Sequence, residues 1–352
     1  MPVTAVDLFC GAGGLTRGLL DAGIHVVAGI DFDQNCEYAY QHNNQAQFLH
    51  ERIEDVHRDT ILRYYPENDI KLLVGCAPCQ PFSSHTNKYK KDPSAPRDER
   101  WFLLNHFARL VEEVRPDIIS MENVPQLSKQ QIFVDFVSKL RALSYHVSWS
   151  VVFCPDYGIP QRRSRLVLLA SQYGDIRLMA PTHVPENYRT VRNAIGDIIP
   201  IAAGESNETD KLHCSSRLNA LNMRRIQNSL PGGTWRDWSE DLLCLCHKKD
   251  SGSTYASVYA RMEWDQPSPT ITTEFYNYGT GRFGHPEQDR ALSLREGALL
   301  QTFPADYEFL PDDKFSFKQI GKMIGNAVPV RLGEVIGETI LNHLRERGVI
   351  DE

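Results

Sequence analysis

The sequence predicts an α/β fold with a doubly wound, mostly parallel β-sheet and a second, smaller and irregular domain. Three observations predict it. The first 170 residues alternate short apolar runs with helical patterns, and this alternation stops near Pro181. The chain has 352 residues, 41% hydrophobic and 24% charged. It is therefore long enough for one large or two modest domains with a sizeable core.

Short apolar runs bounded by turn residues predict the strands, which are Ala5–Phe9, His25–Ile30, Lys71–Gly75, Asp117–Met121, Val147–Phe153 and Arg165–Ala170. Helical spacing between them predicts the helices Leu15–Ala22, Gln34–Asn43, Trp101–Val114 and Ile132–Leu143. Gly23 and Pro116 follow two of these helices, as a C-terminal glycine and a helix-breaking proline do. Strands that alternate with such helices indicate crossover connections and a parallel sheet.

The less regular domain is expected at 181–285, where Gly, Ser, Asn, Thr and aromatic residues are frequent. A hinge segment is expected at 286–315. A helical pattern returns at Arg331–Arg347, and this last helix is expected to pack back on the first domain. The first domain would then comprise 1–180 and 316–352.

Composition excludes several classes of protein. The net charge is −7 and the pI about 6.0, which argues against a polycationic binder. No apolar run approaches 18 residues, and no basic segment precedes an apolar core near the N-terminus, so neither a membrane span nor a secretory signal is expected. Eight scattered cysteines without such a signal indicate reduced thiols and a cytoplasmic protein.

Four of the predicted strands end on chemically unusual residues. These are Cys10–Gly14, Asp31, Cys76–Pro81 and Glu122–Val124. Ligands of open α/β sheets bind at the carboxyl ends of the strands, so these turns are expected to share one functional edge.

The glycine turn Gly11–Gly14 precedes a helix, where backbone N–H groups can meet a ligand. Its spacing is not that of a dinucleotide-binding G-x-G-x-x-G motif. Asp31 lies 17 residues beyond Gly14, about where an acidic residue meets a ribose hydroxyl. The pair favours a nucleoside-containing cofactor; a tight turn with a capping aspartate is the alternative.

Cys79 lies between Pro78 and Gln80, and Cys76 precedes it with C-x-x-C spacing. Pro78 and Pro81 favour a loop, whereas a redox pair should open a helix, so a nucleophilic thiol is preferred over a redox or merely buried one. Nearby strand ends supply one carboxyl group and two guanidinium groups, from Glu122, Arg163 and Arg165. A thiol with these groups suggests addition to an electron-poor ring.

Two further groups of residues could bind a ligand: a lysine-containing loop and a group of cysteine and histidine residues. Ser84–Arg100 contains Lys88, Lys90 and Lys91 and is interpreted either as a mildly basic lid or as a solvated loop. Cys244, Cys246 and His247 have a spacing that fits no common structural zinc site, so buried or incidental thiols are preferred and no metal is expected.

Together these residues resemble the cytosine-5 DNA methyltransferase family, of the bacterial and phage restriction–modification type. The segments that carry the resemblance follow the family's order across nearly the whole chain; they are Asp7–Gly14, Gly75–Ser83, Glu122–Val124, Gln161–Arg165, Arg290–Pro304 and Gly325–Pro329. Only the stretch of about 181–285 is weakly matched, where the family keeps its variable target-recognition domain.

The resemblance implies S-adenosylmethionine as cofactor on a Rossmann-like methyltransferase fold. The residues that would bind it are Phe9, Gly11, Gly13, Gly14, Leu15, Asp31, Phe32, Pro78, Asn326 and Val328. Phe9 and the glycine turn would hold the methionine part, Asp31 the ribose, and Phe32 would pack on the adenine. Where the family usually has an aspartate for the adenine amine, this chain has Arg52, so Glu51 or a backbone group is expected to replace that contact.

The implied reaction transfers a methyl group to C5 of cytosine. The Cys79 thiolate would add to C6, Glu122 would hydrogen-bond or protonate N3, and Arg163 and Arg165 would orient Glu122 and the base. The base must leave the DNA stack for this chemistry. The expected partners are double-stranded DNA and a cognate restriction endonuclease, and the protein is expected to be a monomer.

The residues expected to bind DNA are mostly basic. They are Gln80, Ser83, Lys88, Lys90, Lys91, Arg224, Arg225, Arg236 and Arg282, with Arg217, Trp235, Trp238 and Arg261 as further candidates. Residues 161–261 carry 14 Lys and Arg against 10 Asp and Glu, a net charge of +4 in an otherwise acidic chain. A basic cleft and salt-sensitive DNA binding are therefore expected.

Other functions remain open from the sequence alone. A branch of the same family modifies tRNA, so an RNA cytosine methyltransferase is the main alternative. An insert of roughly 100 residues favours an enzyme that recognises double-stranded DNA. A catalytically silent binding protein is disfavoured by the presence of Cys79 and Glu122. A nicotinamide dehydrogenase is disfavoured by the glycine spacing.

Overall fold

The structure is a computed structural model, and it describes residues 1–78, 102–249 and 258–351. The chain forms two compact units. The sheet unit comprises Met1–Phe153, Ser164–Pro181 and Val328–Glu352, and the second unit comprises Cys154–Arg163 and Thr182–Ala327.

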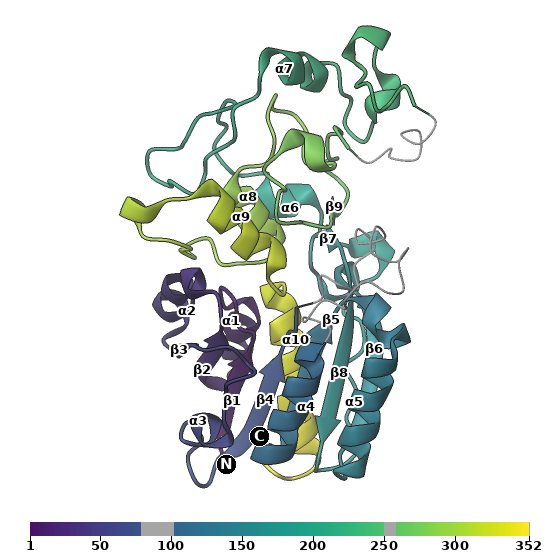
Figure 1. The fold of residues 1–352 in the computed structure, drawn as a ribbon. Coiled ribbons are helices and arrows are strands. Elements are labelled where there is room, and N and C mark those ends of the chain that lie inside the picture. Colours follow the sequence, from purple (N-terminus) through teal and green to yellow (C-terminus); the bar gives the residue numbers. More distant parts are fainter. Residues whose placement is uncertain (79–101, 250–257, 352) are drawn as a thin grey trace, which may run out of the picture. The chain divides into compact units, whose positions relative to one another are not determined.

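The sheet unit is built on a seven-stranded sheet with the order β3-β2-β1-β4-β5-β8-β6 (Figure 1). Its strands are β1 (Val3–Leu8), β2 (His25–Asp31), β3 (Gln47–His50), β4 (Ile70–Gly75), β5 (Ile118–Asn123), β6 (His146–Phe153) and β8 (Ser164–Ser171). The first five strands in this order pair in parallel, and β8 is antiparallel to both of its neighbours. The predicted doubly wound, mostly parallel sheet is confirmed.

Helices cover both faces of this sheet. They are α1 (Gly14–Asp21), α2 (Glu37–Asn44), α3 (Arg58–Leu62), α4 (Leu103–Val114), α5 (Gln131–Ala142) and α10 (Val330–Glu346). Figure 1 shows α4 and α5 in front of the sheet and α10 behind it. Phe107 and Phe136 of the front helices share one apolar core with Leu8 and Met121 of the strands. Such double coverage explains why the central strand β1 is buried along its whole length.

The last helix returns to the sheet unit as expected. α10 packs against α1, and the contact is close because glycines meet there. A Cβ atom on Gly18 would lie 2.1 Å from the carbonyl oxygen of Val330, and one on Gly333 would lie 2.8 Å from that of Leu15. The two helix backbones therefore touch with no side chain between them.

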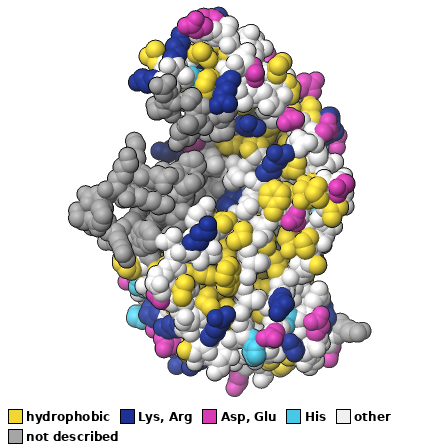
Figure 2. Space-filling model, turned by 90° about the vertical axis from the view of Figure 1, so that its right-hand side faces the viewer, with side chains coloured by type: hydrophobic (Ala, Val, Ile, Leu, Met, Phe, Trp, Pro, Cys, Tyr) yellow, Lys and Arg dark blue, Asp and Glu magenta, His cyan; other side chains and the backbone are white. Residues whose placement is uncertain are grey.

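The short strand β3 was not predicted from the sequence. It has four residues and pairs only with β2. The other end of the sheet is β6, which exposes about half of the Trp149 and Val151 side chains. Figure 2 shows this side of the molecule, where hydrophobic side chains lie among basic and acidic ones.

The second unit consists mainly of loops and short helices. Its elements are α6 (Val191–Ile195), α7 (Ala220–Gln227), α8 (Leu294–Leu300), α9 (Phe317–Asn326) and the two-residue strands β7 (Gln161–Arg162) and β9 (Ser268–Pro269), besides short 3-10 turns. One of its cores gathers Ile226, Trp235, Trp238, Leu242 and Tyr278.

The bounds of the two units differ from the division expected from the sequence. Residues 286–315, expected to form a hinge, lie wholly within the second unit, as do 316–327 and 154–163. Two contacts tie the 286–315 segment to the rest of this unit: Arg290 Nε donates to the carbonyl oxygen of Ile201 at 3.1 Å, and Arg295 Nε lies 2.7 Å from the Asp210 carboxylate. No helix in the described part of the chain is both long and apolar enough to cross a membrane.

Candidate active site

The carboxyl ends of the parallel strands lie along one edge of the sheet. Leu8 of β1 is in register with Ile30 of β2 on one side and with Gly75 of β4 on the other, and Gly75 is in register with Met121 of β5. The turns that follow these strands therefore emerge side by side, as the sequence predicts.

The glycine turn after β1 has a strained backbone. Phe9 has φ 61°, Gly11 φ 51° and Gly13 φ 88°, all in the left-handed region. Glycine adopts this region without steric cost, whereas Phe9 does so at a cost of about 1–3 kcal/mol. Gly13 caps the N-terminus of α1 without a side-chain hydrogen bond, so the backbone N–H groups at this end are available to a ligand.

Asp31, the last residue of β2, holds this turn in place. One carboxylate oxygen accepts a hydrogen bond from the N–H of Gly11 at 2.9 Å, and the other accepts one from the N–H of Asp33 at 2.8 Å. Each carboxylate oxygen can accept more than one hydrogen bond, so a ribose hydroxyl can share this carboxylate with the turn.

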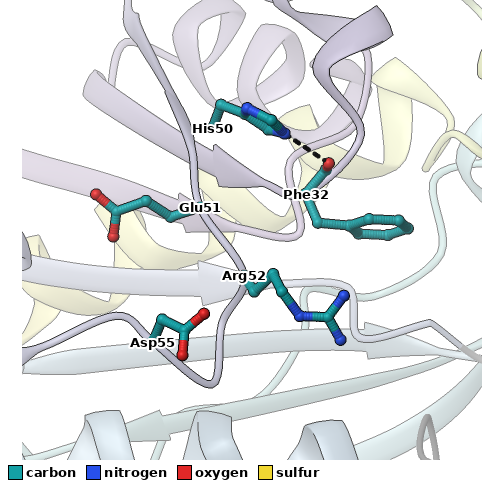
Figure 3. A pocket seen from close by; sticks show the side chains of 5 residues that line it. All are labelled: Phe32, His50, Glu51, Arg52 and Asp55. Atoms are coloured by element: carbon teal, nitrogen blue, oxygen red, sulfur yellow. Dashed lines mark hydrogen bonds between the residues drawn. The ribbon is translucent and has the colours of Figure 1, made fainter.

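A pocket opens beside Asp31, where β2 and β3 end. It has a volume of about 500 Å³ and is lined by Phe32, His50, Glu51, Arg52 and Asp55 (Figure 3). The Nε2 atom of His50 lies 2.9 Å from the carbonyl oxygen of Phe32, which links the two strand ends. Phe32 is 57% exposed and offers an apolar surface beside the polar groups of the pocket.

These features fit an adenosine-containing cofactor. The turn offers backbone donors, Asp31 offers acceptors, and Phe32 offers a flat apolar surface for a base. Gly13 and Gly14 have no side chain and Leu15 is buried, so these residues would contribute backbone groups; Pro78 is half-buried beyond β4. Val328 is buried just before α10, whereas Asn326 is exposed at the end of α9 in the second unit.

Beneath the turn lies a buried carboxyl group that sequence reasoning did not single out. Asp7 is 1% exposed and accepts a hydrogen bond at 2.7 Å from the Thr16 hydroxyl, which also lies 3.0 Å from the hydroxyl of Tyr40. Burial raises the pKa of Asp7 to about 7; the Thr16 hydrogen bond lowers it, and the nearby Asp31 charge raises it further. The motif Asp7–Gly14 contained this residue, but only the fold shows that it is buried.

The buried residue Glu122 lies at the same edge of the sheet, near the carboxyl end of β5. It lies in β5 itself, not in the turn that follows, and is 2% exposed. One carboxylate oxygen is 2.7 Å from Nε of Arg165 on β8, and the other accepts a hydrogen bond at 2.8 Å from the thiol of Cys76. The predicted pairing of Glu122 with Arg165 is thus present in the structure.

The contact with Cys76 was missed at the sequence level. Because Gly75 is in register with Met121, the next residues, Cys76 and Glu122, face each other across β4 and β5. Asn123 strengthens the same junction, since its side-chain amide donates to the carbonyl oxygen of Ala77 at 3.0 Å. The register of two predicted neighbouring strands would have found both contacts.

Arg163 has a different environment from Arg165. It is buried in the second unit, where its guanidinium donates to the carbonyl oxygen of Ile271 at 3.0 Å. It also lies 3.4 Å from the carbonyl oxygen of Ala327. These contacts give Arg163 a role in holding the second unit together, and its predicted role beside Glu122 stays a prediction.

Several predicted residues lie outside the described part of the chain. These are the proposed nucleophile Cys79 and the expected DNA contacts Gln80, Ser83, Lys88, Lys90 and Lys91. The described residues Cys76–Pro78 lead directly to Cys79 from the carboxyl end of β4, beside Glu122.

Among the expected DNA contacts of the second unit, some are exposed and some are not. Arg224 is exposed and pairs with Asp241 at 2.6 Å; Arg236 is exposed, and Arg282 is half-buried. Arg225 is 7% exposed, and its Nε donates to the carbonyl oxygen of Leu242 at 2.8 Å. This burial argues against the predicted DNA contact of Arg225.

The predicted DNA contacts of Trp235, Trp238 and Arg261 are also contradicted by burial. Both tryptophans belong to the apolar core, and Arg261 is 5% exposed and donates to the carbonyl oxygens of Ile226 and His285. A sequence pattern of basic and aromatic residues is the same for a DNA-binding surface and for a core in which buried arginines donate hydrogen bonds to backbone carbonyl groups.

The cluster of Cys244, Cys246 and His247 is compact. The ligand atoms of these three side chains lie within 4.8 Å of one another, and His247 stacks on Trp235 with ring centres 4.1 Å apart. The cluster supplies three ligands from the described residues, one fewer than the tetrahedral set of a structural zinc site. All cysteines in the described ranges are free thiols.

Residues 3–342 match the model of the family described as C-5 cytosine-specific DNA methylase. The chain belongs to this family. It is therefore a methyltransferase that acts on C5 of cytosine in DNA, as the resemblance of its motifs implied.

Two curated relatives are Type II modification enzymes. The chain is 54% identical over 348 residues to the Type II methylase M.HgiDII of Herpetosiphon aurantiacus, with 97% of each chain covered. It is 31% identical to the Type II methyltransferase M1.HphI of Haemophilus parahaemolyticus, covering 97% of this chain and 87% of that one.

The fold is shared with a solved structure of a candidate DNA modification methyltransferase encoded within a prophage (E. coli). The TM-score is 0.72 at 21% identity, and the match covers 97% of this chain and 99% of that one. At this identity the likeness concerns the fold alone.

Proposed function

We propose that this enzyme transfers a methyl group from S-adenosylmethionine to C5 of cytosine in a specific double-stranded DNA sequence, through base flipping and covalent addition of Cys79 to C6. The observation that carries the proposal is the buried Glu122, held by Arg165 and Cys76 beside the strand end that leads to Cys79. This arrangement supports the proposal because an immobile carboxyl group lies beside Cys76, three residues before the candidate nucleophile in the sequence.

The chain's own residues would act as follows. The Cys79 thiolate adds to C6 of the flipped cytosine and forms a C–S bond while Glu122 hydrogen-bonds or protonates N3, so that the ring accepts the electron pair. Arg165 keeps the Glu122 carboxyl group oriented throughout. When bound, S-adenosylmethionine would supply an electrophilic methyl group for the electron-rich C5; the methyl–sulfur bond breaks and S-adenosylhomocysteine leaves. Loss of the C5 proton to a base then expels Cys79 and restores the aromatic ring.

The cofactor would lie along the glycine turn. Backbone N–H groups at the start of α1 and the side chain of Phe9 would face its methionine part, Asp31 its ribose and Phe32 its adenine. The hydrogen bond from Gly11 to Asp31 supports this assignment, because it holds the turn before any ligand binds.

A duplex that contains 5-fluorocytosine at the target site tests the covalent step. Fluorine at C5 prevents loss of a proton there, so the enzyme is expected to remain attached to the DNA as an adduct that survives denaturing electrophoresis. Cys79→Ala is the matched control: it is expected to form no adduct and to transfer no methyl group, yet to bind S-adenosylhomocysteine nearly as well as the wild type. Undiminished transfer by Cys79→Ala would contradict the mechanism.

The substrate is tested by comparing labelled methyl transfer to duplex DNA and to tRNA. Transfer to the duplex alone is expected, whereas transfer to tRNA alone would favour the RNA alternative. Bisulfite sequencing of DNA from cells that express the enzyme then identifies its site. We further propose a cognate endonuclease of a Type II system, so DNA methylated at that site is expected to resist cleavage by it.

A further inference from the structure

The pocket between the ends of β2 and β3 contains a residue whose chemistry differs from that of its neighbours. Three of the five lining side chains are Glu51, Asp55 and His50, which can accept hydrogen bonds, whereas Arg52 can only donate them. The Arg52 side chain is 61% exposed, and its contact with Glu54 is long, at 3.4 Å. The guanidinium is therefore not committed to a strong ion pair with Glu54.

The Phe32 and Arg52 side chains lie so that a flat ligand could fit between them. In Figure 3 the Phe32 ring and the Arg52 guanidinium extend toward the same side of the pocket with open space between them, while the Glu51 and Asp55 carboxylates lie on the other side. Both groups are flat. A guanidinium plane stacks on aromatic rings and is attracted by their electron-rich faces.

The backbone that carries these two residues is held firmly. His50 contacts the Phe32 carbonyl oxygen at 2.9 Å, and the N–H of Glu51 donates to the carbonyl oxygen of Asp31 at 3.2 Å. The N–H of Asp55 donates to the carbonyl oxygen of Arg52 at 2.9 Å and closes the turn that presents Arg52. The backbone at both residues is thus held in place before a ligand binds.

We infer that Arg52 is a cofactor-binding residue that covers the adenine ring from the side opposite Phe32. The inference rests on the proposed function, in which Phe32 already packs on the adenine. Arg52 cannot accept a hydrogen bond from the adenine amine, so it contributes by stacking and by donating to ring nitrogens. Acceptors for the amine come from the carboxylates of the same pocket.

Binding of S-adenosylhomocysteine, measured by isothermal titration calorimetry without DNA, tests this role. Arg52→Ala is expected to raise the Kd roughly 3- to 30-fold, the range of a cation–π contact. Arg63→Ala is the matched control, because Arg63 is an exposed arginine of the same segment whose guanidinium lies over Tyr64, 5.1 Å from the ring centre. This control is expected to bind like the wild type.

Arg52→Lys separates stacking from charge. Lysine keeps the positive charge but lacks the flat guanidinium, so it is expected to recover less than half of the loss in binding free energy. Adenosine, which lacks the methionine part, should show the same fold-loss as S-adenosylhomocysteine in a competition experiment. Thermal denaturation of each variant reports whether it is folded.

The outcomes distinguish the inference from the function on which it rests. Binding by Arg52→Ala at wild-type affinity overturns the role of Arg52 and leaves the proposed cofactor intact. Wild-type affinity of Arg52→Lys overturns the planar contact. No binding of S-adenosylhomocysteine by the wild-type enzyme overturns the cofactor assignment itself.

Discussion

At the scale of single residues, Glu122 has the most constrained surroundings on the functional edge. Its carboxyl group is buried with a guanidinium on one oxygen and a thiol on the other. A buried charge that loses its partner is costly, so Arg165 is expected to contribute to stability in addition to its proposed role of orienting Glu122.

Arg165→Ala is expected to lower the free energy of unfolding by about 3–5 kcal/mol, because Glu122 would keep its burial and lose its counter-ion. Denaturant unfolding measures this change. The double variant Arg165→Ala with Glu122→Gln removes the uncompensated charge and is expected to regain much of the stability but no methyl transfer. Equal stability of the single and double variants would contradict the role of the ion pair.

Asp7 is expected to make stability depend on pH. Its pKa is raised from an ordinary 3.8 to about 7 in the folded protein, chiefly by burial. As the pH rises from about 4 to about 7, the unfolded chain loses this proton before the folded one does. The free energy of unfolding therefore falls across this range, by up to about 1.4 kcal/mol for each unit of pKa difference.

Asp7→Asn keeps the size of the side chain and abolishes its titration. The difference in free energy of unfolding between variant and wild type should therefore change between pH 4 and 7 in favour of the variant and stay constant above that range. Urea unfolding at a series of pH values measures it. A difference that is independent of pH would show that Asp7 titrates normally.

At the scale of elements, the contact between α1 and α10 joins the glycine turn to the last helix of the chain. Gly18→Ala would place a methyl group against backbone atoms of Val330 and Glu334, which cannot rotate away. The helices must separate, and a loss of about 1–3 kcal/mol of stability is expected from such overpacking.

Asp21→Ala is the control for this prediction. Asp21 is the exposed last residue of α1, so its replacement is expected to change the free energy of unfolding by no more than about 0.5 kcal/mol. Because α1 begins at the glycine turn, Gly18→Ala should also weaken binding of S-adenosylhomocysteine. Unchanged stability of Gly18→Ala would show that the helices separate freely.

At the scale of the whole molecule, charge is distributed unevenly along the chain. Residues 161–261 carry a net charge of +4 within a protein of net charge −7. On the face drawn in Figure 2, basic and acidic side chains are interspersed. Attraction to phosphates must therefore come from local groups of exposed basic residues and not from the total charge.

DNA affinity is accordingly expected to fall steeply with salt concentration. Arg224→Ala and Arg236→Ala should each reduce the slope of log K against log salt by about 1 if they contact phosphates. Arg141→Ala, at an exposed position of α5 in the sheet unit, should leave it unchanged. Fluorescence anisotropy with a labelled duplex measures these slopes, and salt-independent affinity would contradict the prediction.

The sequence predicted the sheet of this protein well because its strands are short apolar runs separated by amphipathic helices. It also predicted that the turns after β1, β2 and β4 and the carboxyl end of β5 share an edge, since parallel strands end on the same side. The four-residue β3 was missed because so short a run has no clear periodicity.

By itself, then, the sequence determined the fold class, the family and the edge where the chemistry lies, because these follow from local periodicity and from the order of motifs. Only the tertiary structure decided which side chains meet: Cys76 with Glu122, Asp31 with the turn, and Arg225 and Arg261 with the core of the second unit. The reason is physical, since burial and hydrogen-bond partners depend on strand register and on packing between residues far apart in the chain.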